Sequence, residues 1–138
     1  AYAASGECGE MDIMKVNAIL NTGSLAMRVS EEDIDTITAL SGCGPAFISF
    51  FLKALEDAAV GQGLEKDVAR SLLFQTLAGT YEYLRRNGDT YTDFITKVSS
   101  KGGATLAGLK TAEYYDIERS ICEMVRAATD RSRELAEE

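Results

Sequence analysis

Histidine and tryptophan are absent from this sequence of 138 residues, and proline occurs once, at Pro45. The lack of histidine removes the commonest general base and the commonest metal ligand from the chain. It also argues against a catalytic cysteine, because such a thiol needs an activating base beside it. A single proline leaves room for long helices, since proline in a helix interior breaks the hydrogen-bond ladder.

Cysteine and basic residues are also sparse. The three cysteines, Cys8, Cys43 and Cys122, show the spacing of neither a metal site nor a redox pair, which favours a reduced, cytoplasmic setting. No basic patch for nucleic acid is visible in a chain of net charge -8. Residues 1–10 show no signal-peptide pattern, and the most apolar stretch, 46–52, is far shorter than the ~20 residues of a membrane span. We therefore expect a cytoplasmic protein with no nucleic-acid or membrane partner.

Apolar residues recur at helical spacing over most of the chain, of which 46% is hydrophobic. The pattern predicts a mainly α-helical protein with enough apolar residues for a packed core. Ser30 is expected to cap a helix through its hydroxyl, and the glycine-rich run 41–45 is expected to interrupt that helix. Residues 1–5 are predicted to form a strand or a frayed end, and residues 25–29 a brief extended link. Helices are predicted at 10–21, from 30 to 40, and at 46–60, 66–86, 91–98, 104–115 and 117–136.

The predicted helices of the second half carry apolar faces wider than a small bundle needs. Wide apolar surface on a helix indicates a partner surface, and two-fold homodimers are the commonest oligomers. We therefore expect an obligate homodimer. The large side chains behind this expectation are Phe47, Phe50, Phe51, Phe74, Tyr81 and Leu84.

Two glycine-bearing segments, 41–45 and 99–105, precede predicted helices. Free N–H groups at a helix start bind anions, and glycine lets a ligand approach the backbone closely. Hydroxyls in the second segment add donors for a carboxylate or a phosphate. Ordinary helix capping is the alternative, because serine, threonine and glycine gather at helix starts in any case.

No nucleotide-binding motif accompanies these segments. The pairs of glycines at 42–44 and 61–63 begin like a dinucleotide fingerprint, but the third glycine is missing and neither pair follows a strand. Asp89, at the end of a predicted helix, is placed to meet a substrate ammonium, to cap the next helix or to stay solvated. Cys43 is interpreted as a small packing residue.

Three stretches resemble one family, the pyrroline-5-carboxylate reductases. Residues 38–47, TALSGCGPAF, are similar to that family's T-A-L-S-G-[SC]-G-P-A-[FY] signature. Residues 97–109, KVSSKGGATLAGL, resemble its V-[ST]-S-P-G-G-[AT]-T-x-x-G-L loop at a similar separation. Residues 127–135 match the end of its last helix.

The resemblance implies an architecture of two parts. Residues 1–29 would be a short α/β remnant of the dinucleotide-binding domain. Residues 30–138 would be a helical bundle that interlocks with a second copy, similar to the C-terminal domain of 6-phosphogluconate dehydrogenase. Dimers in this family also assemble further. The half of such a reductase that holds NAD(P)H is not within this sequence, so no cofactor is expected on this chain alone.

The resemblance also implies a reaction, the reduction of 1-pyrroline-5-carboxylate to L-proline by hydride from NAD(P)H. The chain would supply dimerisation and bind the substrate carboxylate through the side chains of Ser100 and Thr105 and the amides of Gly103 and Ala104. Asp89 would lie near the ring nitrogen. The full expected substrate site is Ser100, Gly102, Gly103, Ala104, Thr105 and Asp89, beside a pocket-shaping loop of Ser41, Gly42, Cys43, Gly44 and Pro45.

One position departs from the family pattern, because Lys101 stands where the family usually has proline. Lysine does not fix φ as proline does, so a less rigid loop is expected.

Two other functions are compatible with the sequence. The chain is alternatively a stand-alone helical dimer that acts as a binding or regulatory module, or part of a reductase of a related imine or keto acid.

Overall fold

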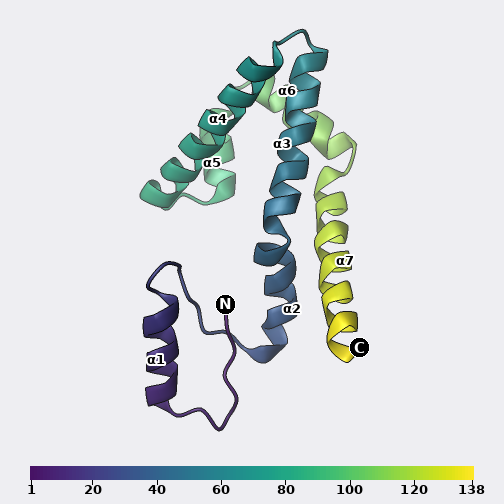
Figure 1. The fold of residues 1–138 in the computed structure, drawn as a ribbon. Coiled ribbons are helices and arrows are strands. Elements are labelled where there is room, and N and C mark those ends of the chain that lie inside the picture. Colours follow the sequence, from purple (N-terminus) through teal and green to yellow (C-terminus); the bar gives the residue numbers. More distant parts are fainter. The chain divides into compact units, whose positions relative to one another are not determined.

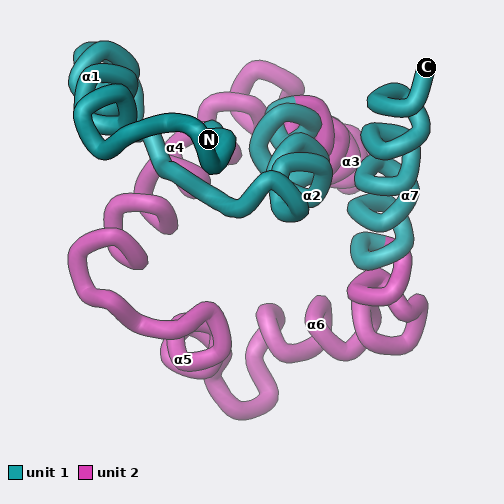
Figure 2. The backbone as a smooth tube through the Cα atoms, turned by 90° about the horizontal axis from the view of Figure 1, so that it is seen from below, with its two compact units in different colours: residues 1–45, 121–138 teal, residues 46–120 magenta.

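The computed structural model describes residues 1–138 and contains seven α-helices (Figure 1). The chain forms two compact units, coloured separately in Figure 2. Unit 1 comprises residues 1–45 and 121–138, and unit 2 comprises residues 46–120. The mainly α-helical fold predicted from the sequence is confirmed.

Unit 1 begins with two extended segments on either side of helix α1 (Glu10–Leu20). Tyr2 pairs in parallel with Arg28, and the Tyr2 N–H donates to the Met27 carbonyl over 3.0 Å. The start of α1 is closed by Asp12, whose carboxylate accepts from the Gly9 N–H over 3.3 Å. The two extended segments and α1 therefore form a small strand–helix–strand arrangement, held by a single bridge.

A continuous helical run follows in three parts. It consists of a 3₁₀ turn (Glu31–Asp33), α2 (Ile34–Ile37) and a π-helical turn (Thr38–Gly42), and α3 (Gly44–Gly61) begins directly afterwards. The prediction that glycines at 41–45 interrupt the helix is wrong, because the extra residue is absorbed by a π turn in which the Cys43 N–H donates to the Thr38 carbonyl over 2.9 Å. The predicted Ser30 cap is also wrong: its hydroxyl donates to the Glu32 side chain, over 3.3 Å, and accepts no backbone N–H.

The rest of unit 1 is the larger part of the last helix, α7 (Ile117–Glu137). Its Ser132 hydroxyl donates to the Asp35 carboxylate over 2.7 Å, across 97 residues of sequence. Ala39 of the π turn is fully buried, and Thr129 of α7 is buried with its hydroxyl bonded to the Val125 carbonyl. The bond between Ser132 and Asp35 joins the end of the chain to α2.

Unit 2 contains most of α3, together with α4 (Lys66–Asn87), α5 (Tyr91–Val98) and α6 (Ala104–Tyr114). The predicted span of α5 is confirmed, and that of α4 is correct to one residue. Local chemistry explains the α4 boundaries, since the Glu65 carboxylate accepts from the Val68 N–H and Gly88 ends the helix at a φ of 66°. Between α3 and α4, Arg70 donates two hydrogen bonds of 2.9 Å to Glu56.

Neither unit contains a core of large side chains. Ala39 and Ala69 are the buried hydrophobic residues, and no large side chain is fully buried. Phe50 is 63% exposed, Phe74 58% and Tyr81 60%. The packed core expected from composition is therefore not formed by the single chain, whereas the expected wide apolar surface on the helices is confirmed.

The run Glu31–Gly61 is long and apolar enough to cross a membrane, judged by length and composition alone. The sequence pattern did not indicate this, because residues 46–52 alone are too short for a span, whereas the helix also includes the turns that precede them. Only 6% of its most apolar window is buried within the chain. Charged residues occur at the start of this run and again in its later half. The first group is Glu31, Glu32, Asp33 and Asp35, and the second is Lys53, Glu56 and Asp57.

Candidate functional site

The segment between α5 and α6 forms a tight turn over residues Ser100, Lys101, Gly102 and Gly103. The Gly103 N–H donates to the Ser100 carbonyl over 2.9 Å, and Gly102 has a φ of +77°. A four-residue turn with positive φ at its third position is the type II arrangement, which requires glycine there. Its second position is the one that proline prefers, and Lys101 occupies it in this chain.

Gly103 is required for a different reason. Its φ of −76° suits any residue, but a Cβ added there would lie 2.4 Å from the Ser100 Oγ and 3.1 Å from the Ser100 carbonyl oxygen. The Ser100 hydroxyl is therefore packed against the residue that begins α6. The two glycines hold the turn closed and bring a hydroxyl to the start of a helix.

The N-terminus of α6 offers free hydrogen-bond donors. No side chain caps it, and its first turn contains no acidic residue. The Gly103 N–H is used inside the turn, and the first backbone bond back to Gly103 comes from Ala107. The amides of Ala104 and Thr105 thus point out of the helix end, where the helix dipole favours negative charge.

Two hydroxyls flank these amides. Ala104 and Thr105 are exposed, and so is Ser100. The Ser99 Oγ is buried without a hydrogen-bond partner. The structure thus brings together five of the predicted residues, Ser100, Gly102, Gly103, Ala104 and Thr105, in an arrangement suited to a small carboxylate.

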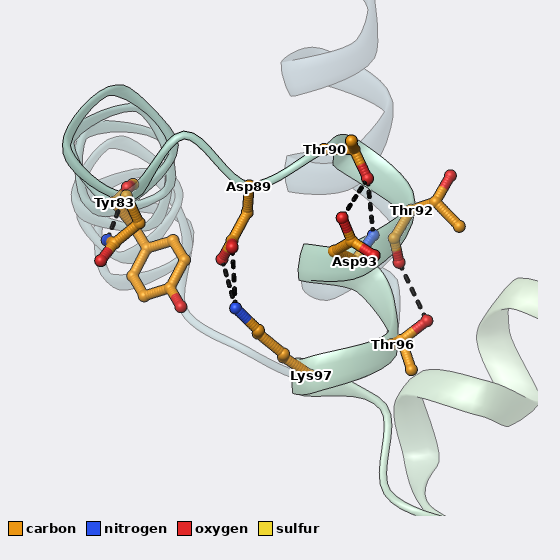
Figure 3. A network of polar contacts seen from close by, with 8 residues as sticks. Tyr83, Asp89, Thr90, Thr92, Asp93, Thr96 and Lys97 are labelled. Atoms are coloured by element: carbon orange, nitrogen blue, oxygen red, sulfur yellow. Dashed lines mark hydrogen bonds and ion pairs between the residues drawn. The ribbon is translucent and has the colours of Figure 1, made fainter.

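Asp89 lies at the other end of α5 and is engaged with its own chain (Figure 3). Its carboxylate oxygens accept from the Lys97 ammonium over 2.8 and 2.7 Å, and its side chain is 17% exposed. The hydrogen bond from Lys97 lowers the pKa of Asp89, and the same bond raises the pKa of Lys97. Burial opposes both changes.

Lys97 and its neighbours were not identified from the sequence. The Tyr83 ring packs on Phe94 with a centroid separation of 4.9 Å, and the Tyr83 hydroxyl helps to lower the pKa of Asp89. Thr90 caps α5 by accepting from the Asp93 N–H over 3.1 Å. The signal in the sequence was the spacing of Asp89 and Lys97. A lysine in the last turn of an eight-residue helix can reach back to a carboxylate just before the first turn.

The predicted pocket-shaping segment is helical. The Ser41 hydroxyl donates to the Ile37 carbonyl over 2.9 Å, and Gly44 is buried. Pro45 stands in the first turn of α3, as predicted, and Cys43 is a half-buried free thiol. Residues Ser41, Gly42, Cys43, Gly44 and Pro45 belong to unit 1, whereas the turn before α6 belongs to unit 2.

The family model described as "Pyrroline-5-carboxylate reductase dimerisation" matches residues 31–135. Among curated proteins, the chain is 33% identical to pyrroline-5-carboxylate reductase 2 of Bacillus subtilis over 99% of its own length and 49% of that protein. It is 35% identical to the pyrroline-5-carboxylate reductase of Synechocystis, covering 98% of this chain and 51% of the relative.

Solved structures agree with this comparison. A pyrroline-5-carboxylate reductase from Coxiella burnetii superposes with a TM-score of 0.89 at 30% identity, covering 96% of this chain and 50% of that one. The Plasmodium falciparum enzyme, described with NADP bound, superposes with a TM-score of 0.86 at 30% identity, covering 93% and 52%. This chain spans about half the length of these relatives. The chain belongs to the pyrroline-5-carboxylate reductase family and corresponds to the part that contains the dimerisation domain.

Proposed function

We propose that this chain supplies the dimerisation and carboxylate-binding part of an enzyme that reduces 1-pyrroline-5-carboxylate to L-proline with NAD(P)H. The observation that carries the proposal is the uncapped N-terminus of α6, where the amides of Ala104 and Thr105 are free beside the Ser100 and Thr105 hydroxyls. Family membership gives this anion site its expected ligand, the carboxylate of the imine substrate. The site comprises Ser100, Gly102, Gly103, Ala104 and Thr105, with Asp89 close by in the sequence.

In this proposal the protein orients the substrate and contributes no covalent group. Donors fixed at the end of a helix hold the carboxylate, and this holds the C=N carbon in one position for attack by hydride. The cofactor supplies the hydride when it is bound. The first turn of α1 contains Glu10 and Asp12, which repel phosphate, so this helix end does not by itself hold the phosphates of the cofactor.

We also propose the division of the chain into residues 1–29 and 30–138. The parallel pairing of Tyr2 with Arg28 around α1 supports the assignment of the first part to a dinucleotide-binding domain, because such domains consist of strand–helix–strand units. The helical remainder would be the dimerisation and substrate-binding domain. The family-model match begins at residue 31.

The homodimer is supported by the exposed apolar surface. The chain has 10896 Å² of accessible surface at a mass of 14.9 kDa. A folded monomer of this mass exposes about 7,000 Å². The excess, about 3,900 Å² per chain or about 7,800 Å² summed over two copies, calls for an interface as large as the largest obligate ones, which bury more than about 5,000 Å² in total. A second copy, interlocked with the first, would cover Phe50, Phe74 and Tyr81; further assembly of dimers and a cytoplasmic location are part of the proposal.

A titration with L-proline tests the carboxylate site. The 138-residue chain should bind L-proline, and Thr105→Ala should weaken the binding about 10- to 150-fold, since a hydrogen bond to a charged group contributes about 1.5–3 kcal/mol. Thr111→Ala, in the same helix with its hydroxyl bonded to the Ala107 carbonyl, is the matched control and should bind as the parent does.

The same titration separates the alternatives. Absence of L-proline binding, or equal binding by Thr105→Ala, would favour a stand-alone helical dimer that acts as a binding or regulatory module. Preference for another cyclic imine or keto acid over a pyrroline analogue would favour a related reductase.

A further inference from the structure

Helix α5 is too short to be stable by itself, since isolated helices below ~12–15 residues are marginal in water. Its eight residues are fixed by three contacts, of which the two polar ones are drawn in Figure 3. Thr90 caps the first turn, Phe94 packs on Tyr83 in the middle, and Lys97 binds Asp89 from the last turn. The position of α5 on α4 therefore depends on side chains.

The Lys97–Asp89 pair is the contact nearest to the anion site. Lys97 is followed by Val98 and Ser99, and the turn Ser100–Gly103 begins immediately afterwards. Lys97 reaches back over eight residues to a carboxylate that precedes the helix, so the pair fixes both ends of α5 against each other. Any displacement of the last helical turn of α5 also displaces Ser100, the first residue of the Ser100–Gly103 turn.

We propose that Lys97 is a positioning residue for substrate binding, which acts through its ion pair with Asp89 to hold the Ser100–Gly103 turn in the orientation that presents the α6 amides. This inference rests on the proposed function. It also changes the role of Asp89, from a contact of the substrate nitrogen to the partner that fixes Lys97.

The geometry favours positioning over direct contact with the substrate. The Lys97 ammonium lies within 2.8 Å of both Asp89 oxygens, so its charge is largely neutralised in place. Its place in the last turn of α5 also suits a cation, because that end of a helix dipole is negative. Lysine at this point stabilises the end of α5 and the start of the turn together.

The test uses the full 138-residue chain with Lys97→Met, Lys97→Arg and the control Lys53→Met. Lys53 forms an ion pair with Asp57 within α3, away from the turn in sequence, and is the matched exposed lysine. Two quantities are measured for each variant: the ¹⁵N order parameters of the backbone amides, and the affinity for L-proline.

For Lys97→Met we expect the order parameters of residues 99–103 to fall from about 0.85 to below about 0.6, while those of α4 stay unchanged. L-proline affinity should fall about 5-fold, because the bound geometry is then only a fraction of the population. Lys97→Arg should restore both quantities, and Lys53→Met should leave both unchanged.

Three results would overturn the inference: unchanged order and affinity in Lys97→Met, failure of Lys97→Arg to restore them, or loss of order that spreads through α4. If the parent chain does not bind L-proline, the proposed function fails, but the order parameters still decide whether Lys97 holds the turn.

Discussion

Each of the four residues of the turn before α6 has a separate physical role. Ser100 places its hydroxyl against the helix start, Gly102 adopts the positive φ, and Gly103 leaves the space that Ser100 occupies. Lys101 occupies the second position of the turn, where proline fixes the required φ and lysine does not. Ser100, Gly102 and Gly103 were predicted from the sequence as part of a site, but the reason for each glycine was visible only in three dimensions.

Replacement of Lys101 by proline should stabilise the chain. The second position of a type II turn has the φ that proline fixes, and no backbone hydrogen bond from the Lys101 N–H would be lost. Because the substitution restricts the unfolded chain, we expect a gain of about 0.4–1 kcal/mol in the free energy of unfolding. Urea denaturation measures it, and a loss of stability would show that the turn is not of this type.

Replacement of Gly103 by alanine should destabilise the chain and weaken L-proline binding. The new Cβ would overlap the Ser100 Oγ, and overpacking of this kind costs about 1–3 kcal/mol. In a Ser100→Ala background the worst overlap is absent, so the same substitution should cost less. A double-mutant cycle by thermal unfolding measures this coupling. Equal costs in the two backgrounds would contradict the described contact.

At the scale of helices, sequence patterns predicted most of the elements but not how the chain joins them. Helix α5 was predicted at its observed bounds, Tyr91–Val98, although its Thr90 cap was not identified. The π turn at Thr38–Gly42 was not, since its glycines and Pro45 are the residues that usually end a helix. The pair of Lys97 with Asp89 was also missed, because the sequence does not show that α5 folds back on α4.

Ion pairs that join helices make the fold of unit 2 dependent on pH. Lys97 lowers the pKa of Asp89, and Arg70 lowers that of Glu56 between α3 and α4. A carboxyl group with a lowered folded-state pKa stabilises the fold above its unfolded pKa of about 4 and loses that contribution as pH falls through the folded value. The pKa of Lys97 is raised, so its contribution is lost only as pH rises above about 10.4.

We therefore expect the melting temperature to fall on acidification below about pH 4, and to fall less in Asp89→Asn. Differential scanning calorimetry over a pH series measures both. Glu113→Gln, an exposed residue of α6 outside these ion pairs, is the control and should follow the parent more closely. An acid-induced fall that is identical in Asp89→Asn and the parent would contradict a stabilising role for this pair.

At the scale of the whole molecule, the exposed apolar surface accounts for the need for a partner chain. The single chain buries Ala39 and Ala69 but leaves Phe50, Phe74 and Tyr81 more than half exposed. The sequence predicted this wide apolar surface and a partner to cover it, yet composition alone suggested a core within one chain. Within the single chain no large side chain is fully buried, so such a core is absent.

The same surface explains the long apolar run Glu31–Gly61. Lys53, Glu56 and Asp57 lie in its later half, and Glu56 is tied to Arg70 of α4, which would be costly in lipid. A second protein chain would bury the apolar residues of this run without placing these charged residues in lipid.

Size-exclusion chromatography with light scattering, in buffer without detergent, tests this account most directly. A homodimer is the predicted result, with a mass of twice 14.9 kDa and helical circular dichroism that is lost together with the dimer on dilution or heating. A helical, cooperatively melting monomer of 14.9 kDa would contradict it, because the exposed apolar side chains would then need no partner.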